Sequence, residues 1–174
     1  NIPVDELTAM PILTEYFSEK NLEDLVVVAV DVGISKRARD LAERLGVPLA
    51  IVEKRRVTFQ SAPQTLNVIG DVDGKTAVLF DDEIDSGSSI VNAASALRDR
   101  GTKVVYAVCT HGVLSAGSTE RILNSDIREL VVTDTIPVFQ PELDGRLTVL
   151  SVAQLFGEAI HRIHNGLSVG SMFE

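Results

Sequence analysis

The residues best placed for chemistry lie between positions 76 and 91, in the stretch TAVLFDDEIDSGSSIV. The apolar run from Thr76 to Phe80 predicts a buried strand, and two carboxylates, Asp81 and Asp82, follow it. A turn of small residues then leads into a predicted helix that carries Ile90. In open α/β sheets, ligands bind beyond the carboxyl ends of the strands, where helix N-termini present free backbone N–H groups to anions. The stretch therefore predicts a phosphate site with carboxylates beside it.

The turn has the composition of a phosphate-binding loop and consists of Asp85, Ser86, Gly87, Ser88 and Ser89. Small side chains let backbone amides wrap a phosphate, and hydroxyls can donate to its oxygens. The two adjacent carboxylates would repel that phosphate, so we expect them to bind sugar hydroxyls of the same ligand or to act through a divalent ion. The alternative is an ordinary strand–turn–helix junction in which Ser88 or Ser89 is the N-cap.

Composition limits the classes of protein to which the chain can belong. With 174 residues, of which 45% are hydrophobic, it can bury one sizeable core but hardly two full domains. The net charge of −9 and the low aromatic content of 5% argue against nucleic-acid binding. No apolar run is long enough for a membrane span, no signal peptide is recognised, and a lone Cys109 suits a cytoplasmic protein. Because the chain starts at Asn1, we also expect a fragment.

Alternating strand and helix patterns predict a mostly parallel, three-layer α/β sheet. A first helix is expected after Asp5 or Thr8. The further predicted helices cover 37–45, the segment from 88 or 89 to about 100, 118–124 and 152–164, and the predicted strands cover 25–30, 48–52, 67–72, 76–80, 103–109, 129–132 and 147–150. Asp73-Gly74 is a strong hairpin signal, so the two strands around it are predicted to pair antiparallel. The last helix is expected to bury one apolar stripe, formed by Leu155, Phe156, Ala159, Ile160 and Ile163.

Two further segments carry charge in positions that suggest function. Asp31-Val32-Gly33 follows the apolar strand at 25–30 and precedes a helix, so it is a second strand–loop–helix junction with an acidic residue first. Asp31 is either a metal ligand or a plain helix cap. The triplet Lys54-Arg55-Arg56 opens a long polar loop over 57–66. Taken alone, the triplet fits a solvated run of charge.

Seven segments in register resemble the carboxyl-terminal half of the ribose-phosphate pyrophosphokinases. They are IPVDELTAMPIL, DVG, EKRR, NVIGDVDGKTAVLFDDEID, THGVLSAGSTERI, ELVVTDTIP and EAIHRIHNGLSV. The resemblance implies a fold of the type I phosphoribosyltransferase kind with a flexible-loop element. It also implies a homo-oligomeric enzyme that uses Mg²⁺ to move the diphosphoryl group of ATP onto the anomeric hydroxyl of ribose 5-phosphate.

The resemblance also assigns roles to the residues singled out above. The turn from Asp85 to Ser89 would hold the 5-phosphate, and Asp81 with Asp82 would hold the ribose hydroxyls. Asp31, Val32 and Gly33 would form the diphosphate turn, with Asp31 at the metal. Lys54 and Arg56 would be the catalytic cations that close over the phosphates.

The chain departs from the family pattern at several positions. Ile34 replaces a second glycine, Ser-Gly-Ser-Ser replaces Thr-Ala-Gly-Thr, and Ser168-Val169-Gly170 alters a regulatory phosphate site. The family's amino-terminal half, which includes a metal-binding histidine, has no counterpart in this sequence, and its three histidines, His111, His161 and His164, do not replace it. We therefore expect one domain over 1–174, inactive or nearly so by itself, whose final helix packs on that other half. A non-catalytic synthetase-associated regulator and a base-using phosphoribosyltransferase are the alternatives.

Overall fold

The computed structural model describes residue 2, residues 4–55 and residues 65–173. Arg56 and most of the polar loop that follows it lie outside these residues. The described elements, in chain order, are α1 (Met10–Glu19), β1 (Leu25–Ala29), α2 (Ser35–Leu45), β2 (Leu49–Arg55), β3 (Thr65–Ile69), β4 (Thr76–Ile84), α3 (Ser88–Asp99), β5 (Val104–Gly112), α4 (Ser118–Leu123), β6 (Ile127–Thr133), η1 (Pro141–Leu143), β7 (Leu147–Leu150), α5 (Ala153–His164) and η2 (Gly170–Met172).

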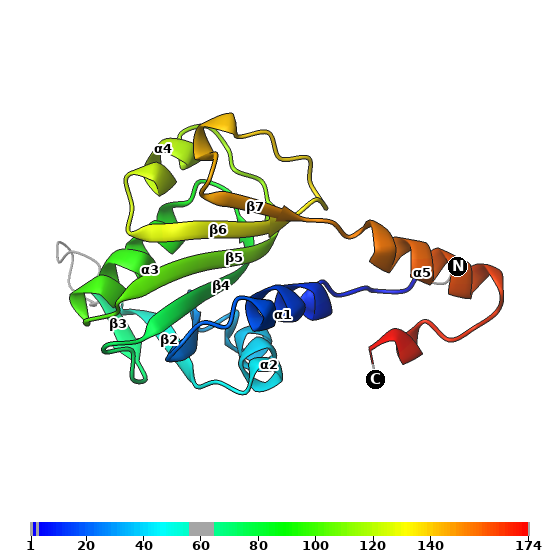
Figure 1. The fold of residues 1–174 in the computed structure, drawn as a ribbon, viewed down its shortest axis with the longest axis horizontal. Helices are drawn as coiled ribbons and strands as arrows, with labels where there is room; N and C mark the ends of the chain where they lie inside the picture. The colour runs from blue at the N-terminus through cyan, green and yellow to red at the C-terminus, as the bar shows by residue number, and fades with distance from the viewer. Residues whose placement is uncertain (1, 3, 56–64, 174) are drawn as a thin grey trace.

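The strands form one seven-stranded sheet in the order β3-β2-β1-β4-β5-β6-β7. All neighbouring strands are parallel except β2 and β3, which are antiparallel. Helices α1 and α2 cover one face of the sheet and α3 and α4 cover the other (Figure 1). The prediction of a mostly parallel three-layer α/β sheet is confirmed. No helix in the described ranges has the length and apolar character needed to cross a bilayer.

The central strands are continuous apolar runs because both of their faces are covered. Val26 to Ala29 in β1 and Ala77 to Leu79 in β4 are fully buried. Phe17 and Leu41 pack on this core from one helical layer, and Leu97 packs on it from the other. A parallel sheet buried on both sides needs such runs rather than alternation of apolar and polar residues.

The predicted hairpin around Asp73-Gly74 is wrong. β3 pairs with β2, and β4 lies between β1 and β5, parallel to both. The turn itself is real, since Gly74 has a φ of 67° and its N–H donates to the Gly101 carbonyl at 3.0 Å. Burial decides the pairing, because the apolar run of β4 can be covered on both faces only at the centre of the sheet. The turn therefore carries the chain from an edge strand to the centre.

The expectation that α5 buries its apolar stripe is also wrong. Ala159 is buried, but Phe156, Ile160 and Ile163 are 47%, 65% and 58% exposed. The helix projects beyond the end of β7, away from both helical layers (Figure 1). Its start is held by Asp134, which accepts hydrogen bonds from Ser151 Oγ at 2.7 Å and from the Val152 N–H at 2.8 Å. That α5 packs on a further domain stays a prediction.

Candidate functional site

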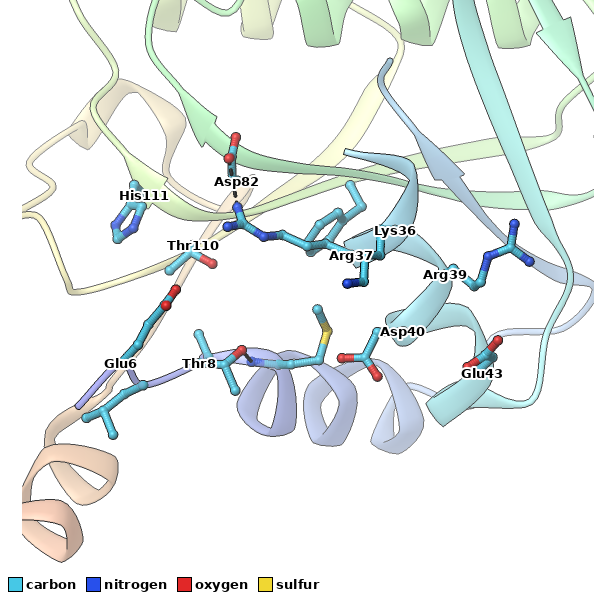
Figure 2. A pocket seen from close by; sticks show the side chains of 14 residues that line it. Glu6, Thr8, Lys36, Arg37, Arg39, Asp40, Glu43, Asp82, Thr110 and His111 are labelled. Atoms are coloured by element: carbon cyan, nitrogen blue, oxygen red, sulfur yellow. Dashed lines mark hydrogen bonds and ion pairs between the residues drawn. The ribbon is translucent and has the colours of Figure 1, made fainter. Parts of the chain in front are cut away.

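Three cavities adjoin along the edge of the sheet where β1, β4 and β5 end. The turn cavity, of about 160 Å³, is lined by Asp81, Glu83 and the residues from Ile84 to Ile90. The central cavity, of about 510 Å³, is lined by Asp31, Gly33, Ile34, Lys36, Arg37, Asp81 and Asp82. The outer cavity, of about 650 Å³, runs between α2 and the segment before α1 (Figure 2). Because Asp81 borders the first two cavities and Asp82 the last two, the three make one polar edge.

The turn between β4 and α3 has the geometry of an anion site. Gly87 adopts a φ of 75°, a left-handed conformation that favours glycine, and α3 begins at Ser88. The N-cap residue is Gly87, so the alternative of a plain N-cap at Ser88 or Ser89 is wrong. Ser86 Oγ instead lies 3.2 Å from Ser88 Oγ and accepts the Ser88 N–H at 3.4 Å. A 12-residue helix thus begins at a cluster of hydroxyls and backbone amides, which suits a phosphate.

The two adjacent carboxylates lie within β4 rather than after it, because the strand continues to Ile84. Successive side chains of a strand point to opposite faces, so Asp81 and Asp82 diverge. Asp81 borders the turn cavity, whereas Asp82 forms an ion pair with Arg37 of α2, with Nη1 and Oδ2 2.9 Å apart (Figure 2). The two carboxylates can therefore contact different parts of one ligand.

The pKa of Asp81 is raised to about 7, and burial is the largest cause. The backbone N–H of Asp82, which donates to Asp81 Oδ1 at 2.9 Å, lowers this pKa, while the carboxyls of Asp82 and Asp31 raise it. Carboxylates gathered at one cavity repel each other, so a bound cation or hydroxyl donor would favour the charged form of Asp81.

The turn between β1 and α2 is closed by its own carboxylate. Asp31 Oδ1 accepts the Ile34 N–H at 3.1 Å, and a Cβ on Gly33 would lie only 3.1 Å from the same oxygen. The N-cap of α2 is Ile34 and has no side-chain cap bond, so Asp31 holds the turn that precedes the helix rather than capping it, and its carboxylate has a second oxygen for a metal. Ile34, the departure from the family pattern, has φ −87° and is buried in the core, so its branched side chain causes no strain.

Lys54, the first residue of the basic triplet, lies beside the turn at the start of α3. It is exposed on β2, and its Nζ lies 3.4 Å from Ser89 Oγ at the start of α3. The exposed side chain also fits the solvated charge that the triplet alone predicts, so a functional role for Lys54 stays a prediction. The other predicted cation, Arg56, lies outside the described residues.

Lys36 and Arg37, which were not predicted as site residues, line both the central and the outer cavity. They lie in the first turn of α2, where cations oppose the helix dipole, and that turn carries no acidic residue. Two cations in a first helical turn without an acidic residue indicate that this helix end binds an anion. His111 was expected to be hydrogen-bonded, and its Nδ1 lies 2.9 Å from Thr135 Oγ1.

A family model described as "Phosphoribosyl synthetase-associated domain" matches residues 56–174. The chain belongs to this family. Among curated relatives, it is 49% identical to the ribose-phosphate pyrophosphokinase of Oceanobacillus iheyensis over 174 residues, which is 100% of this chain and 55% of the relative. It is also 49% identical to that of Bacillus subtilis over 173 residues, 99% of this chain and 54% of the relative. The chain thus spans about half the length of the curated relatives it matches.

Solved structures agree with this membership. The phosphoribosylpyrophosphate synthetase of Mycobacterium smegmatis superposes with a TM-score of 0.86 and 40% identity, over 94% of this chain and 53% of that one. The orotate phosphoribosyltransferase of Aeropyrum pernix, with a TM-score of 0.57 and 21% identity over 88% of this chain and 74% of that one, shares the fold. The resemblance to ribose-phosphate pyrophosphokinases and the type I phosphoribosyltransferase fold are confirmed.

Proposed function

We propose that the chain supplies the ribose 5-phosphate site, the diphosphate turn and the catalytic cations for transfer of the diphosphoryl group of ATP to the anomeric hydroxyl of ribose 5-phosphate. The observation that carries this proposal is the juxtaposition at the end of β4. A helix N-terminus with clustered hydroxyls lies beside carboxylates, and the Nζ of Lys54 on β2 lies 3.4 Å from one of these hydroxyls. The relatives named ribose-phosphate pyrophosphokinase support the reaction.

The turn from Asp85 to Ser89 holds the 5-phosphate, through backbone N–H groups and the serine hydroxyls. Asp81 lies on the turn side of β4, so it accepts hydrogen bonds from ribose hydroxyls of a sugar whose phosphate is bound there. Asp82 faces the central cavity beside Arg37 and orients the far side of the same ring. Binding by both ends of the sugar fixes the position of the anomeric hydroxyl, and such positioning lowers the barrier.

The donor set around the central cavity fits Mg²⁺. Asp31, Asp81 and Asp82 offer hard carboxylate oxygens there, and their mutual repulsion favours a cation. Among the described residues, however, no three or more His, Cys, Asp or Glu side chains are grouped so that they could hold a metal ion together. Mg²⁺ usually binds one or two carboxylates and completes its shell with water and substrate phosphates, so Asp31 alone suffices as the protein anchor. When bound, the ion neutralises polyphosphate charge during transfer.

Lys54 and Arg56 stabilise the charge that moves with the transferred group. Lys54 Nζ lies at the start of α3 in the structure without substrates, and its exposed side chain turns from there toward the transferred group in the closed complex. A cation preorganised over a migrating phosphoryl group acts mainly on the transition state. Val32 and Gly33 complete the diphosphate turn, with Lys36 and Arg37 as the nearby positive charge.

The test uses the 174-residue chain and a fusion of it to the amino-terminal half of the Bacillus subtilis relative. Formation of 5-phosphoribosyl 1-diphosphate is followed by ³¹P NMR with ATP, ribose 5-phosphate and Mg²⁺. We expect turnover by the fusion in the usual enzymatic range, roughly 1–1000 per second, and little or none by the chain alone. A chain that binds no ribose 5-phosphate by calorimetry, together with an inactive fusion, would contradict the proposal and favour the non-catalytic regulator.

A further inference from the structure

Consecutive backbone carbonyls of the turn after β4 are bound from behind by the segment between β5 and α4. The Leu114 N–H donates to the Ile84 carbonyl at 3.0 Å, and the Ser115 N–H donates to the Asp85 carbonyl at 3.2 Å. Both donors are backbone groups, so the path of the chain itself holds these two peptide units. The next carbonyl along the turn is held differently.

The carbonyl of Ser86 accepts a hydrogen bond from a side chain, Arg121 Nη1 of α4, at 2.8 Å. A peptide unit is planar and trans, so the N–H that follows a carbonyl points the opposite way. Binding of the Ser86 carbonyl toward α4 therefore aims the Gly87 N–H away from α4. Because glycine rotates more freely than other residues, the orientation of this peptide unit depends on a hydrogen bond from outside the turn.

The side of the turn that faces α4 is closed to a ligand. Gly87 is buried, and a Cβ built on it would lie 3.7 Å from both Ile122 Cγ1 and the Ser118 carbonyl oxygen. A phosphate must then approach from the opposite side, where the turn cavity opens. That is the side to which the Gly87 N–H points when Arg121 holds the Ser86 carbonyl.

We propose that Arg121 is a positioning residue for phosphate binding, which holds the Ser86 carbonyl against α4 and thereby aims the Gly87 N–H at the bound phosphate. The inference rests on the proposed function, because it takes the 5-phosphate of ribose 5-phosphate as the ligand. If this peptide unit turned over, the phosphate would lose one donor and meet a repelling carbonyl oxygen in its place. Both changes weaken binding, so the single bond from Arg121 has a double effect.

The experiment measures ribose 5-phosphate affinity of the 174-residue chain by calorimetry, with wild type, Arg121→Met and Arg128→Met. Methionine keeps an apolar stem and removes the donor. Arg128 is the matched control, because it is exposed and lies near the amino end of β6, at the opposite edge of the sheet from the turn. Arg121→Met should bind about 10-fold more weakly or worse, the scale of one lost charged hydrogen bond, while Arg128→Met should stay close to wild type.

Salt separates positioning from simple attraction of charge. In about 0.5 M KCl the field of an exposed arginine is largely screened, so a purely electrostatic loss would vanish, whereas the loss caused by a misaligned peptide should persist. Melting temperatures confirm that the variants fold, and if Arg121→Met does not fold, Arg121→Leu, which also removes the donor, replaces it. A wild-type affinity in Arg121→Met, or a loss that disappears with salt, would overturn the positioning role. A wild-type chain that binds no ribose 5-phosphate would contradict the proposed function itself.

Discussion

The turns that start α2 and α3 follow the neighbouring parallel strands β1 and β4, yet their backbone amides have different partners. In the α2 turn, the Asp31 carboxylate occupies the helix start and accepts the Ile34 N–H. In the α3 turn, hydroxyls and amides gather around a left-handed Gly87, and Ser86 Oγ accepts the Ser88 N–H; neither helix has a cap bond from the side chain of its N-cap residue. A helix N-terminus attracts an anion unless the chain supplies one itself. The α3 turn therefore offers its own donors to a phosphate. The α2 turn instead combines a carboxylate that can bind a cation with the positive charges of Lys36 and Arg37.

The glycines of the two turns are required for different reasons. Gly87 is needed for its backbone angle, since the nearest atoms to a built Cβ are at ordinary contact distance. Gly33 has no left-handed angle, and its missing Cβ makes room for the Asp31 carboxylate. A small residue in a phosphate-type loop can therefore allow the backbone angle that the ligand requires, or make room for a neighbouring side chain. Substitutions can separate the two.

The largest expected effect concerns the cation at the α3 turn. Lys54→Ala in the active fusion should lower kcat by roughly 100-fold or more, the scale for loss of one preorganised electrostatic donor. KM values should change far less, because the cation acts mainly on the transition state. The melting temperature should also change little, because exposed charges contribute little to stability. Lys75→Ala is the control, since that lysine pairs with Asp71 at 3.5 Å elsewhere on the surface. An unchanged kcat with a raised KM for ATP would make Lys54 a binding residue only.

The next effect separates the phosphate from backbone strain. Gly87→Val should cost roughly 1–2 kcal/mol of stability or more, because a branched residue is forced into a left-handed angle. It should also weaken ribose 5-phosphate binding by roughly 10-fold or more, because the turn relaxes away from its anion-binding geometry. Gly46→Val is the matched control: Gly46 has a φ of 67° at the end of α2, with open space around it. If calorimetry shows the same loss of affinity in both variants, the assignment of the phosphate site to the α3 turn is wrong.

A smaller effect tests the cation at the α2 turn. The Cβ in Gly33→Ala would meet Asp31 Oδ1 at 3.1 Å, so the carboxylate must give by a few tenths of an ångström. We expect the Mg²⁺ concentration for half-maximal activity of the fusion to rise about 3- to 10-fold, since metal sites are sensitive to the orientation of their ligands. Ribose 5-phosphate affinity without Mg²⁺ should stay at the wild-type value. A loss of sugar-phosphate affinity with unchanged Mg²⁺ dependence would reverse the assignment of the two turns.

The smallest effect is a pH dependence of stability at Asp81. Its folded pKa is raised to about 7 from an ordinary value of 3.8, so between these values the folded state holds a proton that the unfolded state releases. Stability therefore falls as pH rises through this range, and the destabilisation is complete above pH 7. Asp81→Asn should raise the melting temperature at pH 8 and change it little at pH 4, measured by calorimetry in EDTA. The exposed Asp5→Asn is the control, and a gain at pH 4 equal to that at pH 8 would exclude titration of Asp81 as the cause.

The sequence predicted the parts of this site whose signals are local. The apolar runs of β1 and β4 and the small residues after Ile84 appear where local pattern places them, whereas the paired carboxylates lie inside β4 because the strand continues to Ile84. What failed depended on long-range choices. Burial of β4 at the centre of the sheet set the pairing of β3. Ile160 is exposed because no layer of the described residues covers that face of α5. The role of Arg121 could not be foreseen either, because only the folded chain brings α4 behind the turn.

The most direct test of the account is a titration of ¹⁵N-labelled chain with ribose 5-phosphate, followed by amide chemical shifts without Mg²⁺. We predict that the largest shifts fall on Gly87, Ser88 and Ser89, because the α3 turn donates its amides to the phosphate. Shifts at Gly33 and Ile34 should be small, because Asp31 already closes the α2 turn. Saturable shifts centred on the α2 turn, or none at the α3 turn, would contradict it.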